Sequence, residues 1–199
     1  MNKTIHLFRR LALVVGLVVQ STLLNASTLI NGLYYDLDTS SRTATVTYET
    51  IGTDNYASLP ASVKIPETVT CDGITFTVTK VADQAFANCT SLEEISIPGT
   101  VTEIGTTCTS ERYLPFYKCT SLIKVKFEDG VQNISLGVFF STSEPNSSYC
   151  SKGLFAYCPL QEVYIGRNIF YVNYDSYFSF EKYPEYYGYS AFYNQPMLA

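Results

Sequence analysis

One phrase recurs three times along this chain of 199 residues, and a recurring phrase restricts the fold to an array of stacked units. It reads AFANCTSLEEISIP from Ala85, PFYKCTSLIKVKF from Pro115 and LFAYCPLQEVYIG from Leu154. Each copy has a phenylalanine and, three positions later, a cysteine: Phe86 and Cys89, Phe116 and Cys119, Phe155 and Cys158. The apolar letters persist while the polar letters change, which indicates a shared core and a variable surface.

The residues after each cysteine follow a fixed apolar template. Its members are Leu92, Ile95 and Ile97; Leu122, Val125 and Phe127; and Leu160, Val163 and Ile165. The last two of each set are two positions apart and therefore share one face of a β-strand. A second apolar pair follows each set: Val101 and Ile104, Val131 and Ile134, Ile169 and Val172. Each copy thus has two apolar edges that only neighbouring copies can bury, as in a solenoid, and the cysteines should stack inward as small apolar residues.

The copies are unequally spaced, with 30, 39 and 37 residues from one phenylalanine to the next. The extra residues fall in 105–114, 138–153 and 173–190, which we expect to be loops on one side of the array, where binding residues are often found. A fourth copy begins at Phe192, with Gln195 in the cysteine position, and the sequence ends shortly after Leu198. We therefore expect the array either to be incomplete here or to be capped abruptly.

The region before the first full copy predicts two hairpins. The segment TVTCDGITFTVTKV has two β-rich runs around Asp72 and Gly73, a strong hairpin signal. The segment GLYYDLDTSSRTATVTYE alternates on both sides of a polar turn. We interpret residues 27–58 as a capping β-hairpin over the apolar end of the stack, and residues 59–199 as the solenoid.

The first 26 residues have the pattern of a secretory signal peptide. A basic MNKTIHLFRR precedes the apolar LALVVGLVV, which is too short to span a bilayer, and cleavage is expected near Ala26. An uncleaved membrane anchor is the alternative. We predict an exported protein, extracellular or at the cell surface.

The composition of the mature chain excludes several classes of function. The single histidine, His6, lies in the signal segment, so Ser-His-Asp catalysis, Cys-His catalysis and imidazole metal sites are excluded. Three of the thirteen basic residues also lie there, leaving ten against eighteen acidic residues, which argues against a nucleic-acid partner. Since no cysteines have zinc-knuckle spacing, we expect no metal and no cofactor.

The first copy, with the turn that follows it, resembles a known family. AFANCTSLEEISIPGTVTEIG is similar to the BspA-type leucine-rich repeat, which has a small residue and Phe, a later Cys, Thr-Ser-Leu, an alternating strand, Ile-Pro and a Val-Thr-x-Ile-Gly turn. The leading GLYYDLD and CDGITFTVTKV resemble segments that precede such arrays in exported proteins of gut and oral anaerobes. The resemblance covers roughly residues 32–199. The later copies depart from it, since Glu128 replaces the Pro and the third copy is one residue short.

This resemblance implies a leucine-rich-repeat solenoid, right-handed, horseshoe-like and dominated by β-structure. It implies a parallel sheet along one face and short helical or irregular turns opposite. Members of the family are associated with adhesion to host matrix proteins, other bacteria or surfaces. The fold does not transfer a ligand, because function depends on the site.

The outward strand positions are the first candidate binding residues. Glu94, Lys124 and Glu162 should lie side by side on successive strands with alternating charge, which by itself describes a solvated sheet face. The functional alternative is a polar binding platform around Lys126 and Tyr164.

The aromatic insertion near the C-terminus is the second candidate. Eleven of the seventeen tyrosines lie at or after Tyr149, too many for all of them to be buried. We expect Tyr174, Tyr177 and Phe178 either to form a patch for a protein or glycan ligand or to pack on the solenoid edge. A disulfide between Cys108 and Cys150 is possible in an oxidising location and stays open.

These observations favour a binding or adhesion module that recognises an extracellular protein or glycan and is not an enzyme. The alternative is a passive structural or stalk element of the cell envelope. A carbohydrate-active enzyme is a third hypothesis, because carboxylate pairs such as Glu93 and Glu94 exist, but nothing in the sequence places a pair in a pocket.

Overall fold

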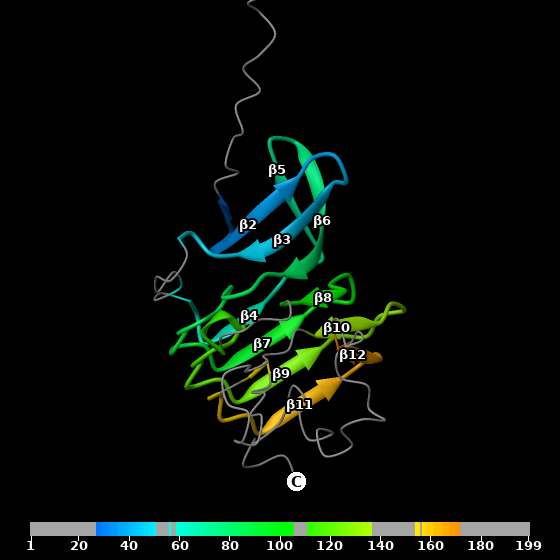
Figure 1. The fold of residues 1–199 in the computed structure, drawn as a ribbon. Coiled ribbons are helices and arrows are strands. Elements are labelled where there is room, and N and C mark those ends of the chain that lie inside the picture. Colours follow the sequence, from blue (N-terminus) through cyan, green and yellow to red (C-terminus); the bar gives the residue numbers. More distant parts are fainter. Residues whose placement is uncertain are drawn as a thin grey trace, which may run out of the picture.

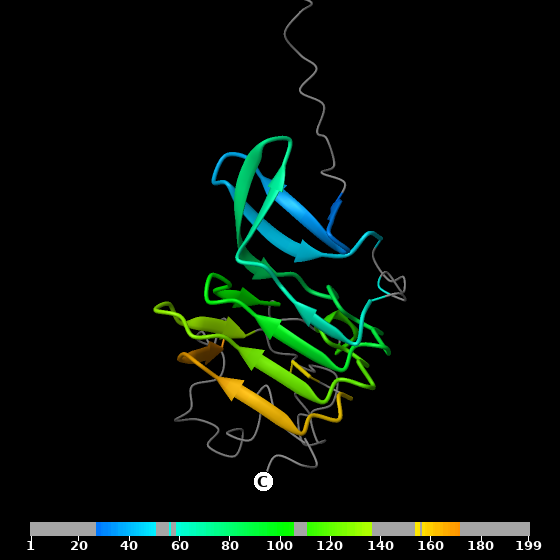
Figure 2. The same cartoon turned by 180° about the vertical axis from the view of Figure 1, so that it is seen from behind.

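A computed structural model describes residues 27–50, 56, 59–105, 111–136, 154–155 and 157–171. In these ranges the regular structure is almost all strand, and the parallel strands form two rows that run side by side along the stack (Figure 1). The first row belongs to a four-stranded sheet, and the second row belongs to a larger sheet that also contains the N-terminal hairpin strands. The same arrangement is seen from behind in Figure 2.

The four-stranded sheet is parallel throughout and has the order β11-β9-β7-β4. Its strands are β4 (Ser62–Lys64), β7 (Glu94–Ile97), β9 (Lys124–Phe127) and β11 (Glu162–Ile165). Equivalent positions of the repeat pair with one another, so that Ile95 faces Val125 and Val125 faces Val163. This confirms the predicted strand in each copy.

The second row consists of short parallel strands where the family resemblance implied helical or irregular turns. It comprises β8 (Glu103–Ile104), β10 (Ile134–Leu136) and β12 (Ile169–Tyr171), which follow the C-terminal end of β6 (Ile74–Val81). The only helix among the described residues is the short 3-10 helix η1 (Glu111–Tyr113). The short helical or irregular turns that the resemblance implied are replaced by strands in this row, because these segments bond to the neighbouring repeat unit instead of to themselves.

The N-terminal region forms the two predicted hairpins. β1 (Thr28–Ile30), β2 (Leu33–Asp38) and β3 (Thr43–Thr47) pair antiparallel in sequence. β5 (Thr68–Cys71) pairs antiparallel with β6 through Asp72 and Gly73, whose φ angles of 50° and 76° suit a type I′ turn. β3 then joins β6 in parallel, which connects the hairpins to the repeat array.

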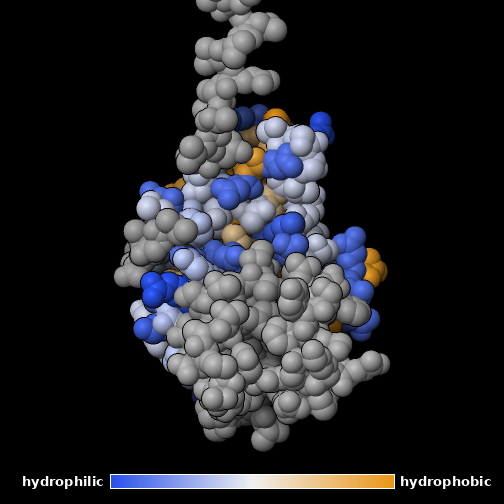
Figure 3. Space-filling model, viewed as in Figure 1, coloured by the Kyte–Doolittle hydropathy of each residue, from blue (hydrophilic) through white to orange (hydrophobic). Residues whose placement is uncertain are grey.

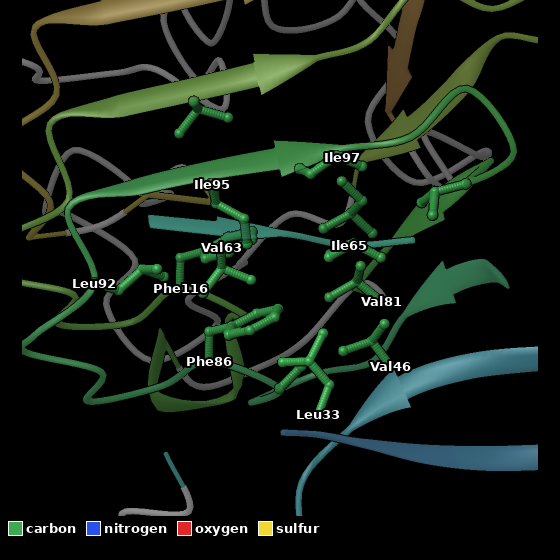
Figure 4. Packing of buried hydrophobic residues seen from close by; sticks show 14 of the residues in the cluster. Leu33, Val46, Val63, Ile65, Val81, Phe86, Leu92, Ile95, Ile97 and Phe116 are labelled. Atoms are coloured by element: carbon green, nitrogen blue, oxygen red, sulfur yellow. The ribbon is translucent and has the colours of Figure 1, made fainter. Parts of the chain in front are cut away.

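The core lies between the rows and is built from stacked equivalent side chains (Figure 4). The rings of Tyr56, Phe86, Phe116 and Phe155 form a continuous stack, with successive centroids 5.4, 5.4 and 5.0 Å apart. Tyr56 therefore occupies the phenylalanine position of the repeat unit that contains β4, a role that the sequence pattern did not indicate for this residue. Its hydroxyl donates to Thr47 O and accepts from Tyr34 N, both at 2.8 Å.

The three repeat cysteines are buried, as predicted. The thiol of Cys119 donates to Phe86 O at 3.0 Å, and that of Cys158 donates to Phe116 O at 3.2 Å. Each thiol thus bonds to a carbonyl of the preceding coil. This cysteine ladder adds directional contacts to a column that the sequence suggested was merely apolar.

Two predicted core positions are wrong. Val131 is fully exposed, because the register pairs Leu136 with Ile104 and so makes the turn of the second copy two residues longer than that of the first. The inward residues of this copy are Ile134 and Leu136. Ile165 is 51% exposed, and β11 pairs with only one strand, β9, in the described part of the chain.

Candidate functional site

On the outer face of the four-stranded sheet, the predicted sheet residues lie in two lines of side chains that cross the strands. Alternate residues of each strand point away from the core, which follows from the period of two along a strand. The parallel register aligns Ser62, Glu94, Lys124 and Glu162 in the first line, and Lys64, Ser96, Lys126 and Tyr164 in the second line. The expected Glu94, Lys124 and Glu162 ladder is therefore present.

In the first line of side chains, neighbouring charged residues carry opposite charges. Lys124 Nζ lies 2.9 Å from Glu162 Oε1, and this hydrogen bond, with a smaller contribution from Glu94, raises the pKa of Lys124. Both side chains of the pair are substantially exposed, so solvent screens the ion pair and it contributes little to stability. Lys124 is thus already neutralised by the protein itself.

The second line of side chains lies beside a charged group, Glu128, that the sequence did not single out. Glu128 Oε1 accepts from Ser96 Oγ at 2.8 Å and lies 3.0 Å from Lys64 Nζ. Partial burial would raise the pKa of Glu128, but these two hydrogen bonds outweigh burial and lower it. Glu128 stands where the first copy has Pro98, and that departure from the repeat was the available signal.

Tyr164 lies at the corner of the face beside two charged residues. The ammonium of Lys126 is 5.4 Å from the centroid of its ring, and its hydroxyl donates to Asp129 Oδ1 at 2.8 Å. This hydrogen bond is the main reason that the pKa of Tyr164 is raised. Tyr164 is 44% exposed, so its ring is oriented by neighbours on both sides and still reaches solvent.

Gly166 allows Asp129 to reach Tyr164. A Cβ atom added at Gly166 would lie 2.5 Å from Asp129 Oδ1 and 2.7 Å from Asp129 N, closer than real Cβ contacts. Only glycine therefore lets the carboxylate lie against this backbone. Asp129 and Gly166 were not predicted as site residues, because neither occupies a strand position of the repeat.

A buried arginine fixes the backbone under this corner. Arg167 is 8% exposed and donates through Nη1 to Gly99 O at 2.7 Å and through Nη2 to Pro98 O at 2.8 Å. It reaches from the third copy to the first across Gly130, where a Cβ would lie 3.4 Å from its Cδ. Burial lowers the pKa of Arg167. The guanidinium therefore ties three coils together beside Asp129.

Several sequence predictions lie outside the described residues. These include the aromatic residues Tyr174, Tyr177 and Phe178, the cysteines Cys108 and Cys150, the core position Val172, the loops 138–153 and 173–190, the signal segment 1–26 and the fourth copy from Phe192. The structure brings together only the sheet residues of the predicted set.

The described surface offers mainly polar groups. In the part visible in Figure 3, hydrophilic residues predominate and hydrophobic residues form small separate spots. No helix among the described residues is long and apolar enough to cross a membrane. In the same ranges, no three Cys, His, Asp or Glu side chains lie together as metal ligands. Recognition on this surface would therefore depend on hydrogen bonds and isolated aromatic rings.

Solved leucine-rich-repeat structures are similar to this fold. A leucine-rich cell surface protein from Faecalibacterium prausnitzii matches with a TM-score of 0.51 and 24% identity, over 73% of this chain and 32% of that one. A leucine-rich-repeat protein from Bacteroides ovatus matches with a TM-score of 0.45 and 21% identity, over 72% of this chain and 37% of that one. This chain thus spans about a third of the length of these structures. No curated protein gives a significant sequence match.

The family model for the BspA-type leucine-rich repeat region matches six copies, at residues 31–144 and 68–183. These two matches together include every strand described above except β1. The stacked phenylalanines, the cysteine ladder and the parallel sheet show how its repeat is built in three dimensions. The chain belongs to the BspA-type leucine-rich-repeat family.

Proposed function

We propose that this chain is an exported binding module that recognises an extracellular protein or glycan through the outer face of its four-stranded sheet. The observation that carries the proposal is the corner of that face, where an exposed ring is oriented by Lys126 and Asp129. Such pre-arranged contacts lower the entropy lost on binding. Glu94, Lys124 and Glu162 extend the same surface towards the start of the strands.

Tyr174, Tyr177 and Phe178 are proposed as a second contact region, on the strength of the sequence alone. Tyrosine combines a large contact area with a hydrogen-bonding tip and few rotatable bonds, as binding surfaces require. The proposal gives catalysis no part.

The alternative is a stalk or envelope element with no ligand. The observation that favours it is the internal pairing of Lys124 with Glu162 and of Lys64 with Glu128, which is sufficient for a solvated sheet. This alternative gives no role to the orientation of Tyr164.

Export and capping complete the proposal. Residues 1–26 would be removed on secretion, which agrees with the cell-surface description of the Faecalibacterium prausnitzii protein. Residues 27–58 would cap the array of residues 59–199. Support for the cap comes from Tyr56, which stacks on Phe86 and bonds to both β2 and β3.

The test is binding of the purified chain 27–199 to immobilised host matrix proteins and to a glycan array. Two variants accompany it: Lys126→Gln with Tyr164→Ala, and Tyr174, Tyr177 and Phe178 all changed to Ala. We expect the parent to bind, and at least the sheet variant to lose binding while its melting temperature stays unchanged. If the parent binds nothing above background, the stalk alternative replaces this proposal.

A further inference from the structure

On the basis of this proposed function, we infer that the ligand at the corner formed by Lys126, Asp129 and Tyr164 is a neutral pyranose glycan. The C–H face of the sugar would stack on the Tyr164 ring, and its hydroxyls would bond to Asp129 and Lys126. Three features of the corner support this class of ligand: the oriented ring, the charge balance and the free hydrogen-bonding atoms.

The ring is a fixed stacking surface. Its hydroxyl is held by Asp129 and its face is approached by Lys126, which limits its rotation without burying it. A pyranose has weakly apolar C–H faces that match an aromatic ring in size. An exposed aromatic ring with hydrogen-bonding groups at its edge suits a sugar better than it suits a fully apolar ligand.

The charge of the outer face, taken together with its corner, is balanced. Lys64 is paired with Glu128 and Lys124 with Glu162. The full set of cations is Lys64, Lys124, Lys126 and the buried Arg167, and the full set of anions is Glu94, Glu162, Glu128 and Asp129. A sulfated or otherwise polyanionic glycan needs an excess of Lys and Arg, as phosphate backbones do. The outer face has no such excess, and the chain as a whole carries a net charge of −5. An uncharged ligand therefore fits it best.

The free hydrogen-bonding atoms of the corner include both an acceptor and a donor. Within the described part of the chain, Asp129 Oδ2 accepts no hydrogen bond, and Lys126 Nζ makes no hydrogen bond or ion pair. A carboxylate oxygen accepts and an ammonium donates, so together they match the hydroxyl groups of a sugar, each of which can do either. An extended peptide would instead use backbone groups at a strand edge, and it would not need the ring.

Gly166 has a positioning role in this site. Its missing side chain gives Asp129 the room to reach the Tyr164 hydroxyl. Gly166→Ala should displace Asp129, which weakens glycan binding because the Tyr164 ring loses one of the two groups that orient it.

The experiment measures binding of the chain 27–199 to three kinds of immobilised probe: neutral glucans, mannans and galactans; heparin as a polyanion; and gelatin as an extended peptide. The variants are Tyr164→Ala, Tyr164→Phe, Asp129→Asn and Gly166→Ala. Lys80→Gln is the matched control, because Lys80 also forms an exposed ion pair, 3.2 Å from Glu103, but on the second row.

We expect a neutral polysaccharide to bind, and Tyr164→Ala to weaken that binding by about tenfold or more. Tyr164→Phe, Asp129→Asn and Gly166→Ala should weaken it by a smaller factor of about three to ten. The control should bind like the parent. Binding should change little between about 50 mM and about 500 mM salt, because no net charge is neutralised.

The other outcomes separate this inference from the function on which it rests. If heparin or gelatin binds and Tyr164→Ala abolishes that binding, the sheet face is a binding site but the ligand class is wrong. If a neutral glycan binds equally to the parent and to Tyr164→Ala, the corner is not the site and the inference is overturned. If no probe binds, both the inference and the proposed function fail.

Discussion

At the scale of single residues, Arg167 shows how much of this fold depends on departures from the repeat. The equivalent positions in the other copies are Gly99 and Asp129, so the repeat pattern does not predict an arginine here. It is nevertheless buried, and it satisfies two carbonyl groups at a turn where the coils lie too close for other side chains. One side chain therefore joins coils that have no strand pairing with each other.

Arg167→Ala should destabilise the protein by about 1–3 kcal/mol, because the carbonyls of Pro98 and Gly99 lose their partners in a buried place. Urea unfolding measures the change. Arg167→Lys keeps the charge but not the two-pronged geometry, so it should recover only part of the loss. Full recovery by lysine would show that charge, not geometry, matters here.

The cysteine ladder supplies a second residue-scale prediction. Burial raises the pKa of the Cys119 thiol, and the thiol donates a hydrogen bond to Phe86 O. A thiol reagent should modify the partly exposed Cys71 in the folded protein and should reach Cys119 only after unfolding. Peptide mass mapping gives the extent of labelling at each site. Equal labelling of Cys119 and Cys71 in the folded protein would contradict the buried ladder.

At the scale of elements, strands of period two were predictable, and the packing between coils was not. Ile95 and Ile97, and their equivalents in copy two, alternate with polar residues, so β7 and β9 were readily expected. The second row was missed because two or three residues carry too little periodicity to indicate a strand. Its pairing with neighbouring coils, such as Leu136 with Ile104, is set by contacts distant in sequence.

In the candidate site as well, some residues were predicted from the sequence and others were not. Lys126 and Tyr164 were predicted because they occupy regular outward positions of the template. Glu128, Asp129 and Gly166 lie just past the strands, where the copies differ from one another. Their importance depends on close approach between coils, which a single sequence does not display.

The turn between β2 and β3 gives an element-scale prediction about pH. Hydrogen bonds from Ser40 and Ser41 lower the pKa of Asp38 from 3.8 to about 2. Since the folded state holds this carboxylate in its charged form, its contribution to stability is complete above about pH 4 and is lost as the pH falls towards 2. Asp38→Ala should flatten the loss of stability over this interval, measured by thermal melts at several pH values.

Asp36 on the same hairpin provides a control of opposite sign. Asp36 is exposed at the surface, but the surrounding protein partly desolvates its carboxyl group and raises its pKa, so its contribution to stability increases as the pH falls. Asp36→Asn should therefore steepen the loss of stability in acid. A flattening in both variants would show that the effect comes from net charge and not from the turn.

At the scale of the whole molecule, one hydroxyl group adds to the parallel pairing of β3 with β6 in joining the N-terminal hairpins to the repeats. Tyr56 stacks on the phenylalanine column and bonds to both β2 and β3. Tyr56→Phe keeps the stack and removes both bonds, which should cost about 1–3 kcal/mol, because Tyr34 N and Thr47 O are left without that partner. Chemical denaturation tests this value. A loss below about 0.5 kcal/mol would mean that strand pairing and packing are enough to connect the N-terminal hairpins to the array.

The central claim about the whole molecule is that the stacked coils create a binding surface on the outer face of the four-stranded sheet. Amide NMR shifts recorded on the labelled chain 27–199, as a bound glycan or protein is added, test this claim most directly. The account predicts that the changes centre on Ser96, Lys126 and Tyr164, on neighbouring strands of one face. Changes confined to the second row, at Glu103, Ser135 and Ile169, would contradict it.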